Sequence, residues 1–239
     1  MKLDILAFGA HPDDVELGCS GSIAKAINQG KKVGIIDLTL GELGTRGTPE
    51  LRLEEATTAA KILKISHREN LKFRDGFFIN DEAHQKSIIT MIRRFKPKVV
   101  LCNAPFDRHI DHGKGSQLVN DACFLSGLQK IKTLYQDEQQ QVWRPKIVLE
   151  YIQWNEITPH IIVDISGFLD IKVDAVMAYS SQFYDSENTT SNTPISSSNF
   201  LDSIRYRAKN LGRLINTDAG EGFTSRQPLS IDMFDALLR

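Results

Sequence analysis

Short apolar runs alternate with amphipathic segments along the first part of the chain. The apolar run from Leu3 to Gly9 is followed by Val15 to Gln29, where apolar residues recur at helical spacing, and Gly30 then supplies a helix stop. Lys32 to Leu38 has the composition of a second buried strand. Because the connection is too long for a hairpin, the pattern predicts a parallel strand-helix-strand unit.

The same alternation continues toward the C-terminus. Thr48-Pro49-Glu50 is typical of a helix start, with an N-cap, a proline at the first helical position and an acidic first turn. Further elements are expected as helices at 49–63, 82–95, 113–128 and 203–214, and as strands at 99–103, 147–152 and 161–164. This order predicts an α/β protein, a Rossmann-like three-layer α/β/α arrangement with a mostly parallel sheet, as a single domain over residues 1–239.

The amino-acid composition and the net charge limit the kinds of partner molecule that we expect the protein to bind. The chain has 239 residues, 41% hydrophobic and 25% charged, with a formal net charge of -1. Without a basic excess we expect no nucleic-acid and no membrane-surface partner, and a small-molecule ligand fits better. The N-terminal apolar run is too short for a signal-peptide core, which favours a cytoplasmic protein.

Two minor features have simple interpretations. Cys19, Cys102 and Cys123 are widely spaced and odd in number, so we interpret them as small core residues rather than as disulfide or thiolate-metal partners. The segment 185–199 is rich in serine, threonine and asparagine, which predicts a mobile loop or a lid.

The first candidate for chemistry is His11-Pro12-Asp13-Asp14, at the end of the first predicted strand. In a parallel sheet this position faces the ligand crevice. A single aspartate here would usually be a helix N-cap. Two adjacent carboxylates repel one another, however, and a bound cation is the simplest compensation.

The second candidate is the polar string from Asp107 to His112, which follows the predicted strand at 99–103. Taken alone, a His-x-Asp-His string in a loop could be solvated surface. Because the carboxyl ends of parallel strands share one edge of the sheet, both clusters can face the same crevice. Imidazole and carboxylate ligands without a nearby thiolate suit a zinc ion with an open coordination position.

These two motifs resemble those of the LmbE-like or PIG-L family of zinc-dependent N-acetylglucosaminyl deacetylases. The resemblance rests on Ala10-His11-Pro12-Asp13-Asp14-Val15-Glu16 and on His109-Ile110-Asp111-His112, and it extends over nearly the whole chain. The segments 41–48, 51–52 and 179–183 most resemble the bacillithiol-biosynthesis deacetylases, which act on N-acetylglucosaminyl malate. Ile110 stands where the family often has proline, which bears on loop stiffness rather than on ligation.

The resemblance implies a role for each motif residue. His11, Asp14 and His112 would hold one Zn²⁺ per chain, Asp13 would be the general base, and His109 would be a positively charged partner of the oxyanion. Spacing alone does not separate the role of Asp13 from that of Asp14. Asp111 would be a carboxylate behind the metal ligands that orients His109 or His112. The family also implies a homo-oligomer, with a hexamer as one expected state.

Arg52 and Arg108 are the candidate readers of an anionic substrate group, and Glu42 is a weaker candidate for a sugar contact. Arg52 at a helix start is either solvated surface or a bidentate carboxylate partner. A dinucleotide-binding role is disfavoured because no G-x-G-x-x-G follows the first strand. Two alternatives remain open, namely a deacetylase of another N-acetylglucosamine conjugate and a non-catalytic metal-binding or sugar-binding protein.

Overall fold

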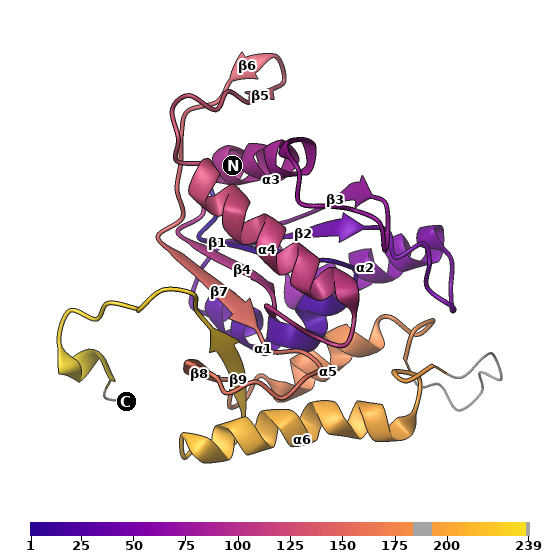
Figure 1. Cartoon of the computed structure of the whole chain (residues 1–239). Helices are drawn as coiled ribbons and strands as arrows, with labels where there is room; N and C mark the ends of the chain where they lie inside the picture. Colours follow the sequence, from indigo (N-terminus) through magenta and orange to yellow (C-terminus); the bar gives the residue numbers. More distant parts are fainter. Residues whose placement is uncertain (184–192, 238–239) are drawn as a thin grey trace.

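A seven-stranded sheet organises the computed structural model, which describes residues 1–183 and 193–237. The strand order is β3-β2-β1-β4-β7-β9-β8, and β9 runs antiparallel to both of its neighbours while the other pairs are parallel (Figure 1). The strands are β1 (Ile5–Gly9), β2 (Val33–Thr39), β3 (His67–Phe73), β4 (Val99–Asn103), β7 (Ile147–Tyr151), β8 (Ile161–Asp164) and β9 (Gly220–Thr224). Two short strands, β5 (Leu134–Tyr135) and β6 (Glu138–Gln139), form a separate hairpin.

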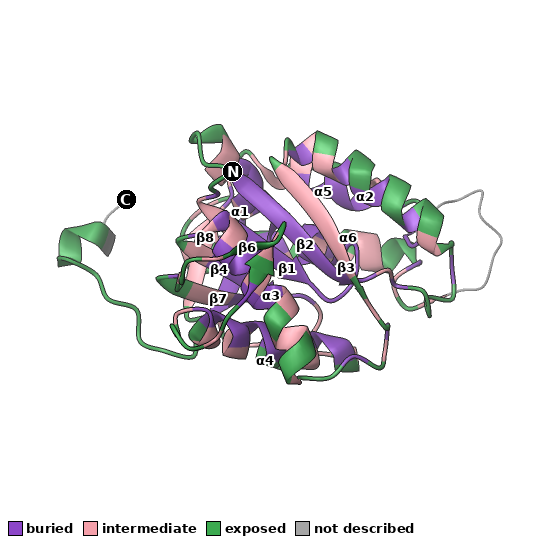
Figure 2. Ribbon diagram, turned by 90° about the horizontal axis from the view of Figure 1, so that it is seen from above, coloured by how far each residue is buried: buried purple, intermediate pink, exposed green. Residues whose placement is uncertain are grey.

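Helices cover both faces of this sheet, because successive strand side chains point to opposite sides. Leu6 and Phe8 of β1 pack in the cluster formed with α3 (Glu82–Phe95) and α4 (Ile110–Leu125), whereas Ala7 packs with α1 (Asp14–Asn28). The helices α2 (Pro49–Leu63), α5 (Leu169–Met177) and α6 (Ser198–Leu214) share a further apolar cluster. Figure 2 shows β1 and its neighbours as the buried centre, with exposure rising on the outer helices.

The position of β1 explains where a ligand can bind. β1 pairs with β2 on one side and with β4 on the other. The chain leaves β1 into α1 on one face and leaves β4 into α4 on the other face. These diverging connections open a crevice at the carboxyl ends of β1 and β4, which is the usual ligand position in such sheets.

The predicted α/β class with a mostly parallel sheet is confirmed, and the three cysteines are buried and free, as expected. Several elements were not predicted or were misplaced, among them β3, α5 and α6. β3 is an edge strand with the polar sequence HRENLKF, so its apolar pattern is weak. α5 was not predicted, and α6 begins at Ser198, capped by the Ser197 side chain, five residues before the predicted start.

The predicted loop lies largely outside the described part of the chain. Of the predicted loop at 185–199, residues 185–192 lie outside the described residues, and the last two belong to α6. Within 1–183 and 193–237, none of the helices combines the length and the apolar character needed to cross a membrane.

Candidate metal and catalytic site

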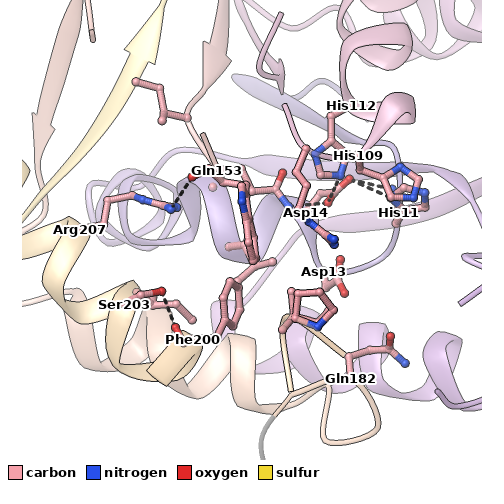
Figure 3. Close-up of a pocket in the computed structure, with 18 of the residues that line it drawn as sticks. His11, Asp13, Asp14, His109, His112, Gln153, Gln182, Phe200, Ser203 and Arg207 are labelled. Carbon is pink, nitrogen blue, oxygen red and sulfur yellow. Dashed lines mark hydrogen bonds and ion pairs between the residues drawn. The ribbon is translucent and has the colours of Figure 1, made fainter. Parts of the chain in front are cut away.

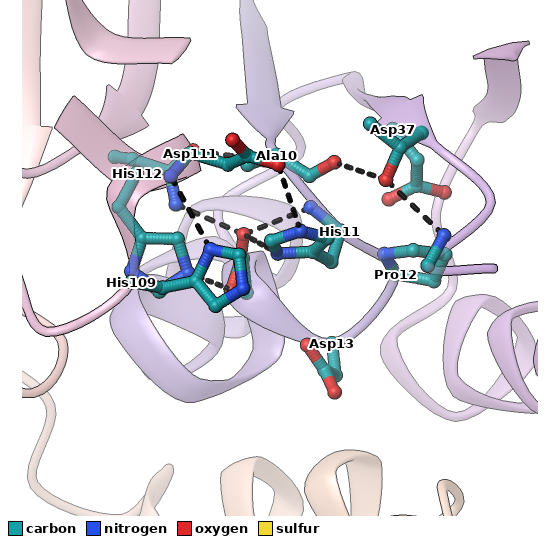
Figure 4. Close-up of polar contacts among 12 residues, drawn as sticks. Ala10, His11, Pro12, Asp13, Asp37, His109, Asp111 and His112 are labelled. Carbon is teal, nitrogen blue, oxygen red and sulfur yellow. Dashed lines mark hydrogen bonds and ion pairs between the residues drawn. The ribbon is translucent and has the colours of Figure 1, made fainter. Parts of the chain in front are cut away.

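Residues from both sequence motifs meet at the crevice between β1 and β4. The ring centroids of His11 and His109 lie 4.6 Å apart, and that of His112 lies 5.6 Å from His11 and 5.4 Å from His109. Figure 4 shows the three imidazoles side by side, with Asp13 below them. The spacing rule that placed the two motifs at one sheet edge therefore holds for these side chains.

Asp14 joins the two motifs directly. Its Oδ2 lies 3.5 Å from Nδ1 of His11, and its Oδ1 lies 3.1 Å from Nε2 of His112. The Asp14 carboxylate also accepts hydrogen bonds from the side-chain amides of Asn103, at 3.0 Å, and Gln153, at 2.7 Å. Asp14 is almost completely buried, so these donors hold the carboxylate in one orientation.

Asp13 is held apart from this cluster by its backbone and by an arginine. Its φ of 114° is unusual for a residue with a side chain, and such strain persists where surrounding contacts enforce it. Nη2 of Arg52 donates to Oδ2 of Asp13 at 2.8 Å and to the carbonyl of Pro12 at 2.5 Å. Burial raises the pKa of Asp13 to about 7, although the Arg52 charge opposes that shift. The side chain is thus a buried carboxyl that can exchange a proton near neutral pH.

Carboxylates surround the two buried histidines and change their charge. Burial by itself lowers the pKa of His112. The carboxylates of Asp14 and Asp107 raise it by more than burial lowers it, so that the pKa is about 9. Burial also lowers the pKa of His11. Hydrogen bonds to Asp111, Asp14 and Asp75 outweigh this effect and raise the pKa well above its usual value. The raised pKa values reflect the negative charge of the surrounding carboxylates, a charge that a divalent ion would also balance.

The donor set fits a metal ion. Among the residues that the structure describes, two groups of three bring ligand atoms within 4.8 Å of one another, namely His11 with His109 and His112, and His11 with Asp75 and Asp111. The predicted set of His11, Asp14 and His112 is connected through the two Asp14 contacts. These imidazole and carboxylate donors, with no thiolate among them, have the chemistry of a zinc site.

His109 differs from the other two histidines in its hydrogen bonding. Its Nδ1 accepts the backbone N–H of Asp111 at 3.2 Å, which places the ring proton of the neutral form on Nε2. Burial and the neighbouring His11 and His112 lower its pKa. This geometry leaves Nε2–H as the donor of the neutral ring, and the lowered pKa opposes the positive charge that the resemblance implied for His109, a role that stays a prediction.

The structure adds orienting carboxylates that the sequence pattern did not single out. Asp75 lies 3.0 Å from Nε2 of His11, and Asp107 lies 3.0 Å from Nδ1 of His112. The carboxylate of Asp111 lies 3.6 Å from Nε2 of His11, rather than against His109 or His112. Asp75 follows β3, the strand that was not predicted, whereas Gln153 follows β7, where the strand-end rule could have found it.

The predicted substrate contacts lie in different environments. Arg52 lines the pocket, but it is buried and paired with Asp13. Arg108 also lines the pocket and is less buried than Arg52, with its guanidinium carbon 4.7 Å from the ring centroid of Trp154. Glu42 does not line the pocket, and its carboxylate accepts the backbone N–H of Asp75 at 2.8 Å.

One pocket of about 320 Å³ contains both motifs and extends from them to α6 and β9 (Figure 3). One end of the pocket includes Asp13, Asp14 and the three histidines, and the other end includes Phe200 and Arg207 of α6. The segment 218–223 also reaches the site, because Gly220, Glu221 and Gly222 line the same pocket. The volume suits one small ligand of sugar size.

Comparison with known proteins places these motifs in a family. The family model for GlcNAc-PI de-N-acetylase, PIG-L, matches residues 6–123, a span that contains both motifs. The diacetylchitobiose deacetylase of Thermococcus kodakarensis is 30% identical over 189 residues, which are 75% of this chain and 70% of that protein.

Two solved structures show how far the fold extends. The conserved protein TT1542 of Thermus thermophilus is 33% identical, with a TM-score of 0.86 and coverage of 97% of this chain and 98% of that one. The 4-carboxy-2-hydroxymuconate hydratase of Pseudomonas putida is 20% identical, with a TM-score of 0.77 over 98% and 100% of the two chains, and at that identity it shows the fold alone. The two matched motifs, the site that they build and the relative matched over most of both lengths show that this chain belongs to the PIG-L, or LmbE-like, deacetylase family.

Proposed function

We propose that this protein is a zinc-dependent hydrolase that removes the acetyl group from an N-acetylglucosaminide. The observation that carries the proposal is a buried carboxyl, Asp13, beside a cluster of imidazole and carboxylate ligands in one sugar-sized pocket. Membership of a deacetylase family and the diacetylchitobiose deacetylase relative support N-acetylated sugars as substrates.

His11, Asp14 and His112 are the proposed zinc ligands. When bound, zinc would polarise the amide carbonyl and lower the pKa of a water molecule. Asp107 and Asp75 support this assignment, because each contacts a ring nitrogen of a proposed ligand and can fix its tautomer.

Asp13 is the proposed general base. Its pKa of about 7 suits a group that accepts a proton from water and returns it to the departing amine. Arg52 donates to the same carboxylate, which supports a role in orienting Asp13 as well as, or in place of, the predicted contact to substrate.

His109 is proposed to stabilise the oxyanion of the tetrahedral intermediate. Its Nδ1 is occupied by the Asp111 N–H, so Nε2–H is the donor left on a side chain that lines the pocket. One such donor is typically worth about 3 to 4 kcal/mol of transition-state stabilisation.

The specific substrate that we propose is N-acetylglucosaminyl malate, from the resemblance of residues 41–48, 51–52 and 179–183 to bacillithiol-biosynthesis deacetylases. Arg108, which lines the pocket and forms no ion pair among the described residues, is the predicted anion reader best placed for such a substrate. The predicted homo-oligomer and cytoplasmic location stay predictions, and light scattering after size exclusion would give the assembly mass.

Metal content and acetate release together test the function. The purified protein is expected to retain about one zinc per chain and to release acetate from N-acetylglucosaminyl malate, and more slowly from N,N'-diacetylchitobiose. Asp13→Asn should keep zinc while activity falls by about 100-fold or more, because the proton acceptor is lost. Asp170→Asn, at an exposed position on α5, is the matched control.

Each contrary outcome would favour one alternative over the proposed function or exclude one part of it. Zinc retention without acetate release from either sugar would favour a non-catalytic binding protein. Near-parent activity of zinc-loaded Asp13→Asn would exclude Asp13 as the base, and a preference for the uncharged disaccharide would overturn the malate assignment.

A further inference from the structure

The pocket-facing side of α6 carries one cation, Arg207, among mostly apolar residues. The residues of α6 that line the pocket recur at intervals of three and one, which places them on one face of the helix. They are Phe200, Ser203, Ile204, Arg207, Ala208 and Leu211. Figure 3 shows Arg207 on the opposite side of the pocket from His11. No sequence motif singled out this arginine.

Arg207 lacks the kind of ionic partner that Arg52 and Lys172 have in the same pocket. Arg52 pairs with Asp13 at 2.8 Å, and Lys172 pairs with Glu221 at 2.6 Å. Within residues 1–183 and 193–237, no carboxylate lies within 4.0 Å of the Arg207 guanidinium. Its hydrogen bond is from Nη2 to the carbonyl oxygen of Trp154, at 3.0 Å. A guanidinium has five N–H donors, so most of them remain available.

The surroundings of Arg207 are unfavourable for a positive charge that has no anionic partner. Burial lowers the pKa of Arg207, against the more distant charges of Asp107 and Glu156. A partly desolvated arginine interacts more strongly with an anion than an exposed one does, because water competes less. Arg108, by contrast, already lies over the Trp154 ring.

A short segment after β7 fixes Arg207 relative to the reaction centre. The Gln153 side chain donates to Asp14 at 2.7 Å, and the next residue, Trp154, provides the carbonyl that holds Arg207. The Trp154 ring stacks on Phe200 of α6, with centroids 5.3 Å apart and planes inclined by 19°. The distance from the proposed metal ligands to the guanidinium is therefore set by packed, hydrogen-bonded groups on both sides.

From this arrangement we propose that Arg207 binds an anionic group, a carboxylate or a phosphate, on the part of the substrate that lies beyond the N-acetylated sugar. The proposal rests on the proposed deacetylase function and deepens it, because it assigns the binding of the substrate's anionic group to a residue of α6. An acetamido group at the histidine cluster and an anion at α6 would then occupy the two ends of one pocket.

The test compares anionic and neutral substrates in matched variants. Arg207→Gln removes the charge but keeps an amide that can donate to the Trp154 carbonyl, and Arg207→Lys keeps the charge. Arg205→Met is the control, because Arg205 lies on the same helix and pairs with exposed Asp170 away from the pocket. The substrates are N-acetylglucosaminyl malate, N-acetylglucosamine 1-phosphate and uncharged N,N'-diacetylchitobiose.

Arg207→Gln should lower kcat/KM on at least one anionic substrate by about 10-fold to 100-fold, the usual range for one charge-assisted pair. Its kcat/KM on the uncharged disaccharide should fall by a clearly smaller factor than on that anion, and Arg207→Lys should lose less than Arg207→Gln on the anion. The anion with the larger loss identifies carboxylate or phosphate as the group that is bound. Equal proportional losses on all three substrates, or no loss on either anion, would overturn the proposal.

A binding measurement separates this proposal from the proposed function. If the parent protein releases no acetate from any substrate, the deacetylase assignment fails, but calorimetric titration with N-acetylglucosaminyl malate and with N-acetylglucosamine 1-phosphate still reports on Arg207. Weaker binding of an anion to Arg207→Gln than to the parent and Arg205→Met supports the site. Binding equal in all three proteins, or absent from the parent, overturns it.

Discussion

Replacing Asp107 with asparagine tests how the proposed metal site is oriented. Oδ2 of Asp107 faces Nδ1 of His112 at 3.0 Å and accepts the backbone N–H of Trp154 at 3.2 Å. Oδ1 accepts the backbone N–H groups of Arg108, at 2.7 Å, and Asn155, at 2.9 Å. Each oxygen thus meets two donors when His112 carries its proton on Nδ1.

An asparagine keeps this shape but replaces one acceptor with an NH₂ donor. If the NH₂ faces His112, Nδ1 must become the acceptor, and the ring proton moves to Nε2, the nitrogen that lies 3.1 Å from Asp14. If the NH₂ faces the other way, the N–H groups of Arg108 and Asn155 lose their acceptor, and water can replace it more readily at exposed Arg108 than at part-buried Asn155. Neither orientation satisfies all four donors.

Zinc affinity is therefore expected to fall by about 10-fold to 100-fold in Asp107→Asn, the usual effect of losing an orienting carboxylate. This corresponds to about 1.4 to 2.7 kcal/mol of binding free energy. Competition with a chromophoric chelator measures the affinity, and Asp121→Asn, on the outer side of α4 with exposed partners, is the control. A folded Asp107→Asn protein with parent zinc affinity would refute the reasoning, as would an equal loss in Asp121→Asn.

Three further predictions concern metal retention and stability. His112→Ala should leave little zinc after dialysis, by elemental analysis, and near-full occupancy would exclude it as a ligand. Gly18→Ala should lower the free energy of unfolding by about 1 to 3 kcal/mol, because the added Cβ would lie 2.1 Å from Cδ2 of buried Tyr151. This overpacking exceeds the helix-propensity gain of about 0.5 to 1 kcal/mol. Urea unfolding measures the effect, and an unchanged midpoint would contradict the prediction. Lys172→Met should lower the free energy of unfolding by about 3 to 5 kcal/mol, because Glu221 would stay buried without its cation. A variant that unfolds thermally at the same temperature as the parent protein would contradict this prediction.

The sequence by itself determined the class of fold and the location of the site. Apolar runs at 3–9, 32–38 and 99–103, separated by helical spacing, can form only a small set of layered sheets. The carboxyl ends of parallel strands share one edge, so the positions of His11 and His112 after two such runs already predicted that they meet. Local pattern and a general rule of sheet geometry were sufficient for this part.

Local pattern was insufficient where burial depends on distant neighbours. β3 carries charged residues at the sheet edge, and without it Asp75 had no predicted place beside His11. α5 has only nine residues and was missed because short helices depend on tertiary packing for most of their stability. The start of α6 was missed because its first residues belong to the serine-rich stretch that was expected to be a loop.

Only the tertiary structure decided which charged groups pair and which stay available. Sequence reasoning treated Arg52 and Arg108 as alike, yet Arg52 is buried against Asp13, Arg108 lies over Trp154, and Arg207 faces the pocket without a carboxylate partner among the described residues. Pairing depends on distances of about 3 to 4 Å between side chains far apart in the chain, and on how much water each loses. Neither quantity is encoded in a local pattern, because both are set by the packing of the whole fold.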